Sequence, residues 1–151
     1  MYCANLAGIT YRRILREGDA NSGWSRYVQW VPDADAAIAE LKQTKGNILL
    51  TTGSKTLGQY AEALPPERIY ARVLPTSGVL KSCEVLGILP GHVIAMQGPF
   101  TQALNAAMYD AYSIRVLVSK DSGDVGGVSD KVIPALNKDI QIIMIERPKG
   151  E

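Results

Sequence analysis

The run Ile48-Leu49-Leu50-Thr51-Thr52, which Gly53-Ser54-Lys55 follows, decides the fold class of this chain. It is a short stretch of aliphatic and β-branched residues stopped by a glycine, a pattern typical of a strand buried on both faces of a sheet. Residues 35–44 before it and residues 56–64 after it have the apolar spacing of amphipathic helices. A buried strand between two helices predicts a parallel α/β sheet covered on both sides.

The same alternation of extended and helical patterns continues to the end of the chain. Thr101 is a suitable N-cap for its helix, whereas Pro134 lies inside the last helix, where proline is unfavourable. We therefore predict a three-layer α/β/α sandwich with a mostly parallel, about five-stranded sheet. The further strands expected are residues 69–74, 92–96, 115–119 and 140–145, and the further helices are residues 79–86, 101–112 and 128–136.

The first 30 residues fit this alternation less well. Residues 3–8 look like the end of a helix, and residues 10–15 look like a strand that leads to a charged turn. Trp24 and Trp30 lie in a loop-like stretch, where such residues more often anchor a segment to the core than stack on a ligand. We expect the sequence to begin near the end of a preceding domain.

Length and charge narrow the classes of function. A chain of 151 residues suits one domain with a proper core. Its formal net charge of +1 gives no electrostatic reason to expect nucleic acid or an anionic membrane as partner. Because no apolar run reaches the ~20 residues that span a bilayer and no signal-peptide pattern is present, we expect a cytoplasmic protein. The cysteines, Cys3 and Cys83, lack the spacing of a metal site, so we expect no metal.

Three loops at the expected carboxyl ends of strands carry the same kinds of residue, and ligands of open parallel sheets bind beyond these ends. Hydroxyls, backbone amides and a following helix N-terminus suit a phosphate or a carboxylate, and Lys55 and Lys120 add positive charge. Turns and N-caps require the same residue types, so ordinary turn chemistry stays an alternative for each loop taken alone. The candidate loops are Thr51-Thr52-Gly53-Ser54-Lys55, Gln97-Gly98-Pro99-Phe100 and Ser119-Lys120-Asp121-Ser122-Gly123.

Other signals are weaker. The stretch Gly53-Ser54-Lys55-Thr56 lacks the adjacent Gly-Lys pair of a phosphate-binding P-loop, and no G-x-G-x-x-G dinucleotide fingerprint occurs. His92 is the sole histidine, and we expect it to have a surface or turn role. Cys83 has no candidate base partner and is expected to pack in the core.

At these loops the sequence resembles the precorrin-6A reductase family. Each motif is weak alone, but five motifs in the family's order are fairly specific. Ile9-x-Tyr11-x-Arg13 and Leu15-Arg16-Glu17 also resemble the segment that enters the family's C-terminal domain, so the match spans nearly the whole chain. Lys120-Asp121-Ser122-Gly123 followed by Gly126-Gly127 is more similar to the anaerobic, cobalt-first branch of the family. The matching stretches are Leu49 to Lys55, Ala71 to Pro75, Met96 to Phe100 with Asn105, Ser119 to Gly123 with Lys131, and Glu146 to Pro148.

The resemblance implies a two-domain, NAD(P)H-dependent oxidoreductase that acts on CH–CH groups in cobalamin (vitamin B12) biosynthesis. Such an enzyme moves a hydride from NADPH or NADH to a ring double bond of precorrin-6A, or of its cobalt complex, to give precorrin-6B. Residues 1–30 are then expected to be a remnant of the preceding domain with its connecting segment, and residues 31–151 the C-terminal α/β domain.

The resemblance also implies the site. The tetrapyrrole substrate carries many carboxylates, which agrees with the lysines in the loops, and Asp121 is a candidate to donate or relay a proton. The residues expected to bind substrate or cofactor are Thr51, Thr52, Gly53, Ser54, Lys55, Gly98, Pro99, Phe100, Lys120, Asp121, Ser122 and Gly123.

The family's N-terminal domain, which carries the glycine-rich turn for the cofactor, is absent from this sequence. We therefore expect NADPH or NADH to be bound mostly by that missing domain, the chain to be inactive alone, and its bare domain interface to favour self-association. Two other functions stay open. Half of a uroporphyrinogen-III-synthase-like protein would form product without nicotinamide, and a non-enzymatic α/β ligand-binding module would bind without turnover.

Overall fold

The structure is a computed structural model that describes residues 23–121 and 127–146 of the chain. Within these residues six strands form one sheet, in which every neighbouring pair is parallel and the order is β1-β6-β5-β2-β3-β4. This sheet confirms the predicted α/β fold class. The strands are β1 (Gln29–Val31), β2 (Asn47–Leu50), β3 (Ile69–Val73), β4 (Val93–Ala95), β5 (Ile114–Lys120) and β6 (Gln141–Ile145).

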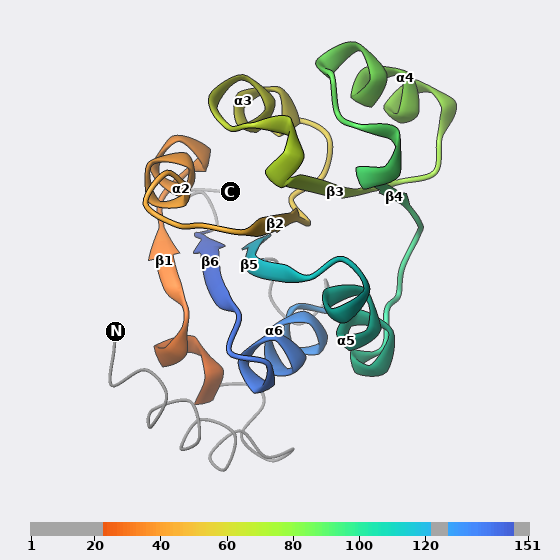
Figure 1. The fold of residues 1–151 in the computed structure, drawn as a ribbon. Coiled ribbons are helices and arrows are strands. Elements are labelled where there is room, and N and C mark those ends of the chain that lie inside the picture. The colour runs from red at the N-terminus through yellow and green to blue at the C-terminus, as the bar shows by residue number, and fades with distance from the viewer. Residues whose placement is uncertain (1–22, 122–126, 147–151) are drawn as a thin grey trace.

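Helices cover both faces of the sheet and make the three layers that the sequence predicts (Figure 1). One face carries α2 (Ala34–Leu41), α3 (Leu57–Ala63) and α4 (Ser77–Leu86). The other face carries α5 (Gln102–Ala111), α6 (Val128–Asn137) and the 3-10 helix η2 (Gly23–Tyr27). Two further 3-10 turns, η3 (Pro66–Arg68) and η4 (Pro90–His92), lead into strands. No helix among the described residues has the length and apolar character to cross a membrane.

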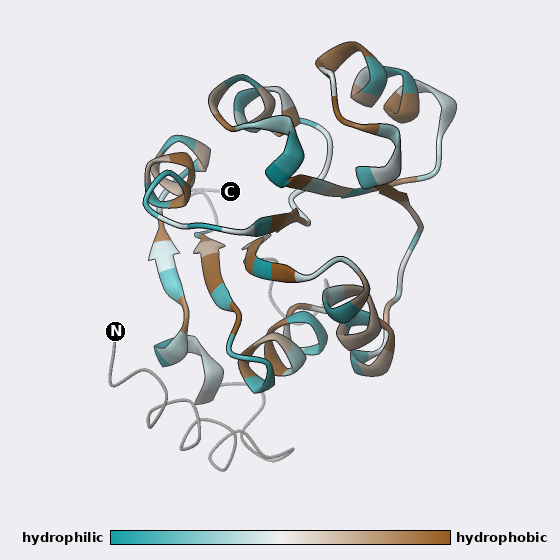
Figure 2. Ribbon diagram, viewed as in Figure 1, coloured by the Kyte–Doolittle hydropathy of each residue, from teal (hydrophilic) through white to brown (hydrophobic). Residues whose placement is uncertain are grey.

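The sheet separates two hydrophobic cores, and neighbouring side chains of its central strands point into different ones. Leu49 and Leu117 pack with α5 and α6, whereas Leu50 and Val118 pack with the helices of the opposite face. All four side chains are at most 2% exposed. Burial on both faces explains why these strands are continuous apolar runs in the sequence, and Figure 2 shows hydrophobic residues, in brown, along them.

The sheet has six strands where the sequence predicts about five, because β1 is missing from the prediction. With only three residues, Gln29–Val31, this strand is too short to show a two-residue periodicity. It pairs with β6 at the edge of the sheet, in the register Trp30 with Met144. The strand expected over residues 10–15 lies outside the described residues.

The tryptophans before α2 hold the first described segment on the α6 side of the sheet. Trp24 is 7% exposed and belongs to the core there, and its indole Nε1 donates to Ser129 Oγ over 3.1 Å. Trp30 stacks on Trp24 with ring centroids 6.2 Å apart. Residues 23–30, which the sequence assigns to a connecting segment, therefore contact the domain.

The ends of two helices follow from their capping residues. Thr101 is the N-cap of α5, as predicted, and its hydroxyl accepts a hydrogen bond from Leu104 N over 3.0 Å. Asp33 caps α2 in the same way by accepting from Ala36 N over 2.9 Å. Each side chain satisfies a backbone N–H that has no partner inside its helix.

The expected proline inside α6 is present and has a structural consequence. Pro134 has no N–H, so the carbonyl of Asp130, four residues earlier, loses its usual partner within the helix. Asn105 of α5 replaces that partner, because its Nδ2 donates to Asp130 O over 2.8 Å. The proline thus ties α6 to α5 by a side-chain hydrogen bond.

Candidate functional site

A pocket of about 550 Å³ opens at the carboxyl ends of β2 and β3. It lies where the connections after two neighbouring strands leave on opposite faces of the sheet. The strands β2 and β5 are neighbours, but α3 follows β2 on one face and α6 follows β5 on the other. Ligands of open parallel sheets bind at such a point. The lining residues are Thr51, Gly53, Arg72, Val73, Leu74, Met96, Gly98, Pro99, Phe100, Asn105, Gly127, Asp130 and Lys131.

Arg72 is the first of two buried cations in this lining. It comes from β3 and is 7% exposed. Its Nη1 donates to Asn105 Oδ1 over 2.6 Å and lies 3.5 Å from Met108 Sδ, and its Cζ lies 3.9 Å from the centre of the Phe100 ring. Burial lowers the pKa of Arg72, yet a guanidinium stays protonated in proteins. The pocket therefore contains a fixed, oriented positive charge.

Asn105 sets the orientation of that charge. It is fully buried on α5, accepts from Arg72 through Oδ1 and donates through Nδ2 to the Asp130 carbonyl that Pro134 leaves free. Both ends of its amide are used, so the side chain cannot rotate without breaking a hydrogen bond. The proline in α6 thereby positions Arg72 through a single intervening side chain.

Lys131 is the second buried cation, and it comes from α6. It is 9% exposed, and its Nζ donates to Thr51 Oγ1 over 3.2 Å, while Thr51 Oγ1 donates to Val118 O over 2.8 Å. Burial, followed by the positive charges of Arg72 and Lys120, lowers the pKa of Lys131 to about 8. This amine therefore exchanges its proton much closer to neutral pH than an ordinary lysine does.

Neither buried cation has a carboxylate partner within salt-bridge distance among the described residues; the ion pair found there joins Lys138 and Asp110 on the surface. The carboxylate in the lining, Asp130, accepts from Gln102 on the exposed side. Buried charges without counterions are unfavourable, and an anionic ligand would relieve that cost. The arrangement can thus bind carboxylates or phosphates.

Two glycines shape the pocket. A Cβ on Gly98 would lie 3.1 Å from Cε2 of Phe100, so the glycine lets this ring stay over Arg72. The peptide between Gly98 and Pro99 is cis. Gly53 has φ +83°, a left-handed conformation that favours glycine, and it turns the chain away after β2.

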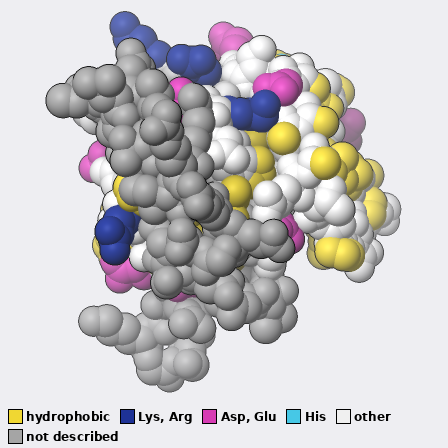
Figure 3. Space-filling model, turned by 90° about the horizontal axis from the view of Figure 1, so that it is seen from below, with side chains coloured by type: hydrophobic (Ala, Val, Ile, Leu, Met, Phe, Trp, Pro, Cys, Tyr) yellow, Lys and Arg dark blue, Asp and Glu magenta, His cyan; other side chains and the backbone are white. Residues whose placement is uncertain are grey.

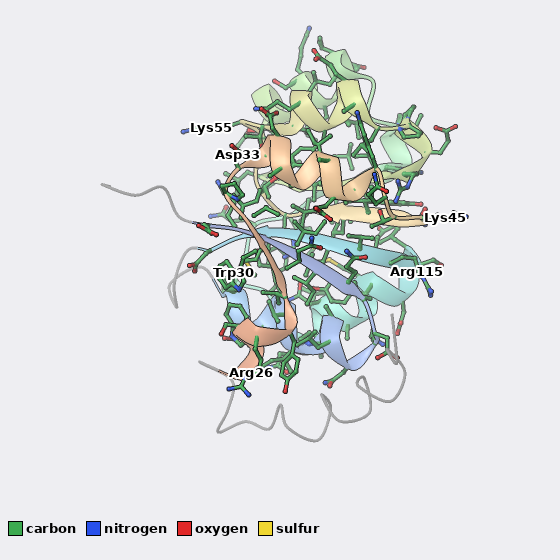
Figure 4. The ribbon with its side chains drawn as sticks, turned by 90° about the vertical axis from the view of Figure 1, so that its left-hand side faces the viewer. Arg26, Trp30, Asp33, Lys45, Lys55 and Arg115 are labelled. Carbon is green, nitrogen blue, oxygen red and sulfur yellow. The ribbon has the colours of Figure 1, made fainter. Side chains whose placement is uncertain are left out.

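The structure brings together part of the predicted site. Thr51, Gly53 and the segment Gly98 to Phe100 line the pocket. Thr52 is 2% exposed and absent from the lining, and so are the half-buried Ser54 and the exposed Lys55. Figure 4 shows Lys55 at the edge where the strands end, pointing away from the molecule.

The third predicted loop contributes less. Lys120 is exposed at the end of β5, and Asp121 is half-buried, with its backbone N donating to Ile145 O over 2.9 Å. Neither lines the pocket, although Lys120 acts on Lys131 through its charge. Ser122 and Gly123 lie outside the described residues. The role of this loop in binding stays a prediction.

The polar groups that dominate the pocket were not among the predicted site residues. Arg72, Asn105, Asp130 and Lys131 come from a strand and from helices, not from loops. A signal existed: Arg72 is a charged residue in a run that reads as a buried strand, and such a residue needs a partner. The motif stretches that resemble the reductase family contain Arg72, Asn105 and Lys131.

The comparisons with known proteins agree on one family. The family model described as precorrin-6x reductase CbiJ/CobK matches residues 1–151. The cobalt-precorrin-6A reductase of Priestia megaterium is 46% identical over 112 residues, which are 72% of this chain and 44% of that protein. The enzyme of the same name from Salmonella typhimurium is 42% identical over 101 residues, covering 67% of this chain and 38% of that protein.

A solved structure supports the same assignment. The structure of a CobK precorrin-6A reductase is 25% identical and superposes with a TM-score of 0.61 over 80% of this chain and 47% of that one. The chain spans about half the length of the curated relatives it matches.

Proposed function

The chain belongs to the precorrin-6x reductase family, and from that premise we propose that its pocket binds the carboxylates of precorrin-6A, or of its cobalt complex, for reduction to precorrin-6B. Members of this family are oxidoreductases of cobalamin biosynthesis.

The observation that carries the proposal is the pair of buried cations, Arg72 and Lys131, in the lining of one pocket. Arg72 presents a planar guanidinium that Asn105 and Phe100 hold in place, and this geometry suits a carboxylate that is bound by two parallel hydrogen bonds. Phe100 and Met96 add apolar surface to the same pocket, which suits the hydrocarbon parts of a tetrapyrrole.

The positive charge of the pocket also suits a nicotinamide cofactor, because the phosphates of the cofactor are anions. When it is bound, NADPH or NADH supplies the hydride of the reaction. We propose that the cofactor is held mostly by the part of the relatives' length that the match does not cover, since no dinucleotide fingerprint occurs in these 151 residues. The chain then contributes tetrapyrrole binding and gives no reduction alone.

Binding to the chain alone tests the pocket. Cobalt-precorrin-6A would be titrated against the chain, against Arg72→Met and against Lys138→Met, a surface control whose lysine pairs with Asp110. We expect Arg72→Met to weaken binding by about tenfold or more, because a charge-assisted hydrogen bond is worth roughly 1.5–3 kcal/mol. The control is expected to bind like the wild type. Equal affinity for all three proteins would refute the role of the pocket.

Turnover tests the rest of the proposal. The chain is assayed with NADPH, first alone and then with the remaining half of the Priestia megaterium relative. We expect precorrin-6B only from the mixture. Product without nicotinamide would favour a synthase-like reaction, and binding without turnover in the mixture would favour a non-enzymatic binding module.

We propose, finally, that the isolated chain self-associates through exposed apolar side chains. Met96 and Leu104 are 39% and 36% exposed near the pocket, and Figure 3 shows hydrophobic side chains gathered on the side of α5. Val85 on α4 is 76% exposed. Light scattering over a range of concentrations is the measurement, and a monomer at every concentration would contradict the proposal.

A further inference from the structure

The polar side chains of the pocket differ in what each can do with a proton. Arg72 keeps its proton at any pH that proteins tolerate, and the amide of Asn105 has none to give. The hydroxyl proton of Thr51 points to Val118 O. Lys131 is the remaining cation, and an ammonium group can both hold and release a proton.

Lys131 is also held in place at both ends. Its Nζ donates to Thr51 Oγ1 over 3.2 Å, and its backbone carbonyl accepts from Tyr109 Oη of α5 over 2.8 Å. The side chain is 9% exposed and faces the pocket. A proton donor needs this kind of fixed position beside the reacting atom.

The surroundings of the amine favour its neutral form. Arg72 faces it from β3 and Lys120 from β5, and both are positive, while burial removes water. Asp130 precedes it on α6 and bonds to Gln102 instead, and Tyr109 contacts its carbonyl. These conditions lower the pKa of Lys131 to about 8, which is close to the range in which a general acid works best.

We propose that Lys131 is the proton donor of the reduction, an inference that rests on the proposed function. When a reduced nicotinamide supplies its hydride to one carbon of the ring double bond, the electron pair of that bond takes up a proton at the other carbon. Lys131 gives this proton from Nζ, keeps the electron pair of the N–H bond and becomes a neutral amine. A proton from water then restores the ammonium group.

This assignment differs from the expectation that Asp121 donates or relays the proton. Asp121 lies at the end of β5 and is not part of the pocket lining, whereas Lys131 is. The two candidates make opposite predictions for the same variants, so an experiment can separate them.

The first measurement is made on the chain without any ligand. Lysine side chains labelled with carbon-13 are titrated by NMR, and Lys131→Arg identifies the resonance of Lys131 by its disappearance. We expect this resonance to titrate near pH 8. Titration of Lys131 in the usual lysine range would overturn the proposal without reference to any reaction.

The second measurement uses the chain together with the other half of the Priestia megaterium relative. Lys131→Arg keeps the positive charge but cannot give up a proton, so the KM for cobalt-precorrin-6A should change little while kcat falls by about 100-fold or more. The wild type should lose activity above pH 8 as the ammonium group is consumed, and the variant should not show this limb. Lys138→Arg is the matched control.

The outcomes separate this inference from the function on which it rests. An active wild type with an equally active Lys131→Arg variant overturns the proton donor alone. Loss of the pH limb in Asp121→Asn instead assigns the proton to Asp121 and also overturns it. A wild type that gives no reduction in the mixture refutes the proposed function, and the donor role with it, even where Lys131 titrates near pH 8.

Discussion

Replacing Lys131 by methionine should make the protein more stable at neutral pH, although the change removes a hydrogen bond. The folded state holds this ammonium group in a buried position beside Arg72, so its pKa is lowered from 10.5 to about 8. Between these pH values the unfolded chain binds more protons than the folded one, and stability therefore rises with pH. Methionine has a similar length and no charge, so it removes the cost of protonation in the folded state.

The size of the effect follows from the shift. Lowering the pKa from 10.5 to about 8 corresponds to about 3 kcal/mol of destabilisation below pH 8, where the lysine is protonated in both states. The lost hydrogen bond to Thr51 offsets about 1 kcal/mol of this, since Thr51 keeps its bond to Val118 O. The expected net gain is about 2 kcal/mol at pH 7. At pH 10 the penalty falls to about 1 kcal/mol and the gain vanishes.

Urea unfolding of the wild type and of Lys131→Met measures the difference in their free energy of unfolding at pH 7 and at pH 10. The difference between the two proteins cancels the titration of all other lysines and tyrosines. Lys138→Met, which removes a half-buried lysine that pairs with Asp110, is the matched control. A variant that is less stable than the wild type at pH 7, or a difference that does not change with pH, would refute the reasoning.

Three further changes test other parts of the site. Asn105→Ala should lower the free energy of unfolding by about 2–4 kcal/mol in urea titrations, because Arg72 and the Asp130 carbonyl both lose a buried partner; a loss below 1 kcal/mol would contradict this. Gly53→Ala and Gly78→Ala both have open space at the new Cβ. The first should lower the free energy of unfolding by about 1 kcal/mol because φ is +83°, and the second, inside α4, should raise it by about 0.5 kcal/mol. Changes of the same sign in the two variants would be inconsistent with a backbone effect. Phe100→Leu should weaken tetrapyrrole binding several-fold, as a titration would measure, because the ring over Arg72 is lost; unchanged affinity would show that this contact has no role.

The fold could be predicted because burial shapes the sequence directly. Leu49 and Leu50 point into different cores, so both must be apolar, and the strand appears as an unbroken aliphatic run. The N-cap of α5 was visible because Thr101 precedes an apolar helical pattern. β1 was not visible, since three residues carry too little periodicity to separate a strand from a loop.

Only those site residues that lie in the loops after parallel strands could be predicted from the sequence. Thr51, Gly53 and Gly98 were identifiable because the end of a parallel strand is a general place for ligands. Arg72, Asn105 and Lys131 come together from β3, α5 and α6, and no local pattern indicates that they meet. In the sequence Pro134 only disfavours a helix, but in the structure it frees the Asp130 carbonyl that Asn105 uses, a relation that depends on the packing of two helices.

The outermost strands of the sheet are also its shortest. Within the described residues β1 and β4 bound the sheet, and each has three residues. An edge strand points its unpaired N–H and C=O groups outward only at every second residue. Each of these edge strands therefore exposes the unpaired backbone groups of only one or two residues. This is too short a template for the continuous backbone ladder on which fibrils grow. We therefore expect any association between copies of this chain to rest on side-chain contacts and to reverse on dilution.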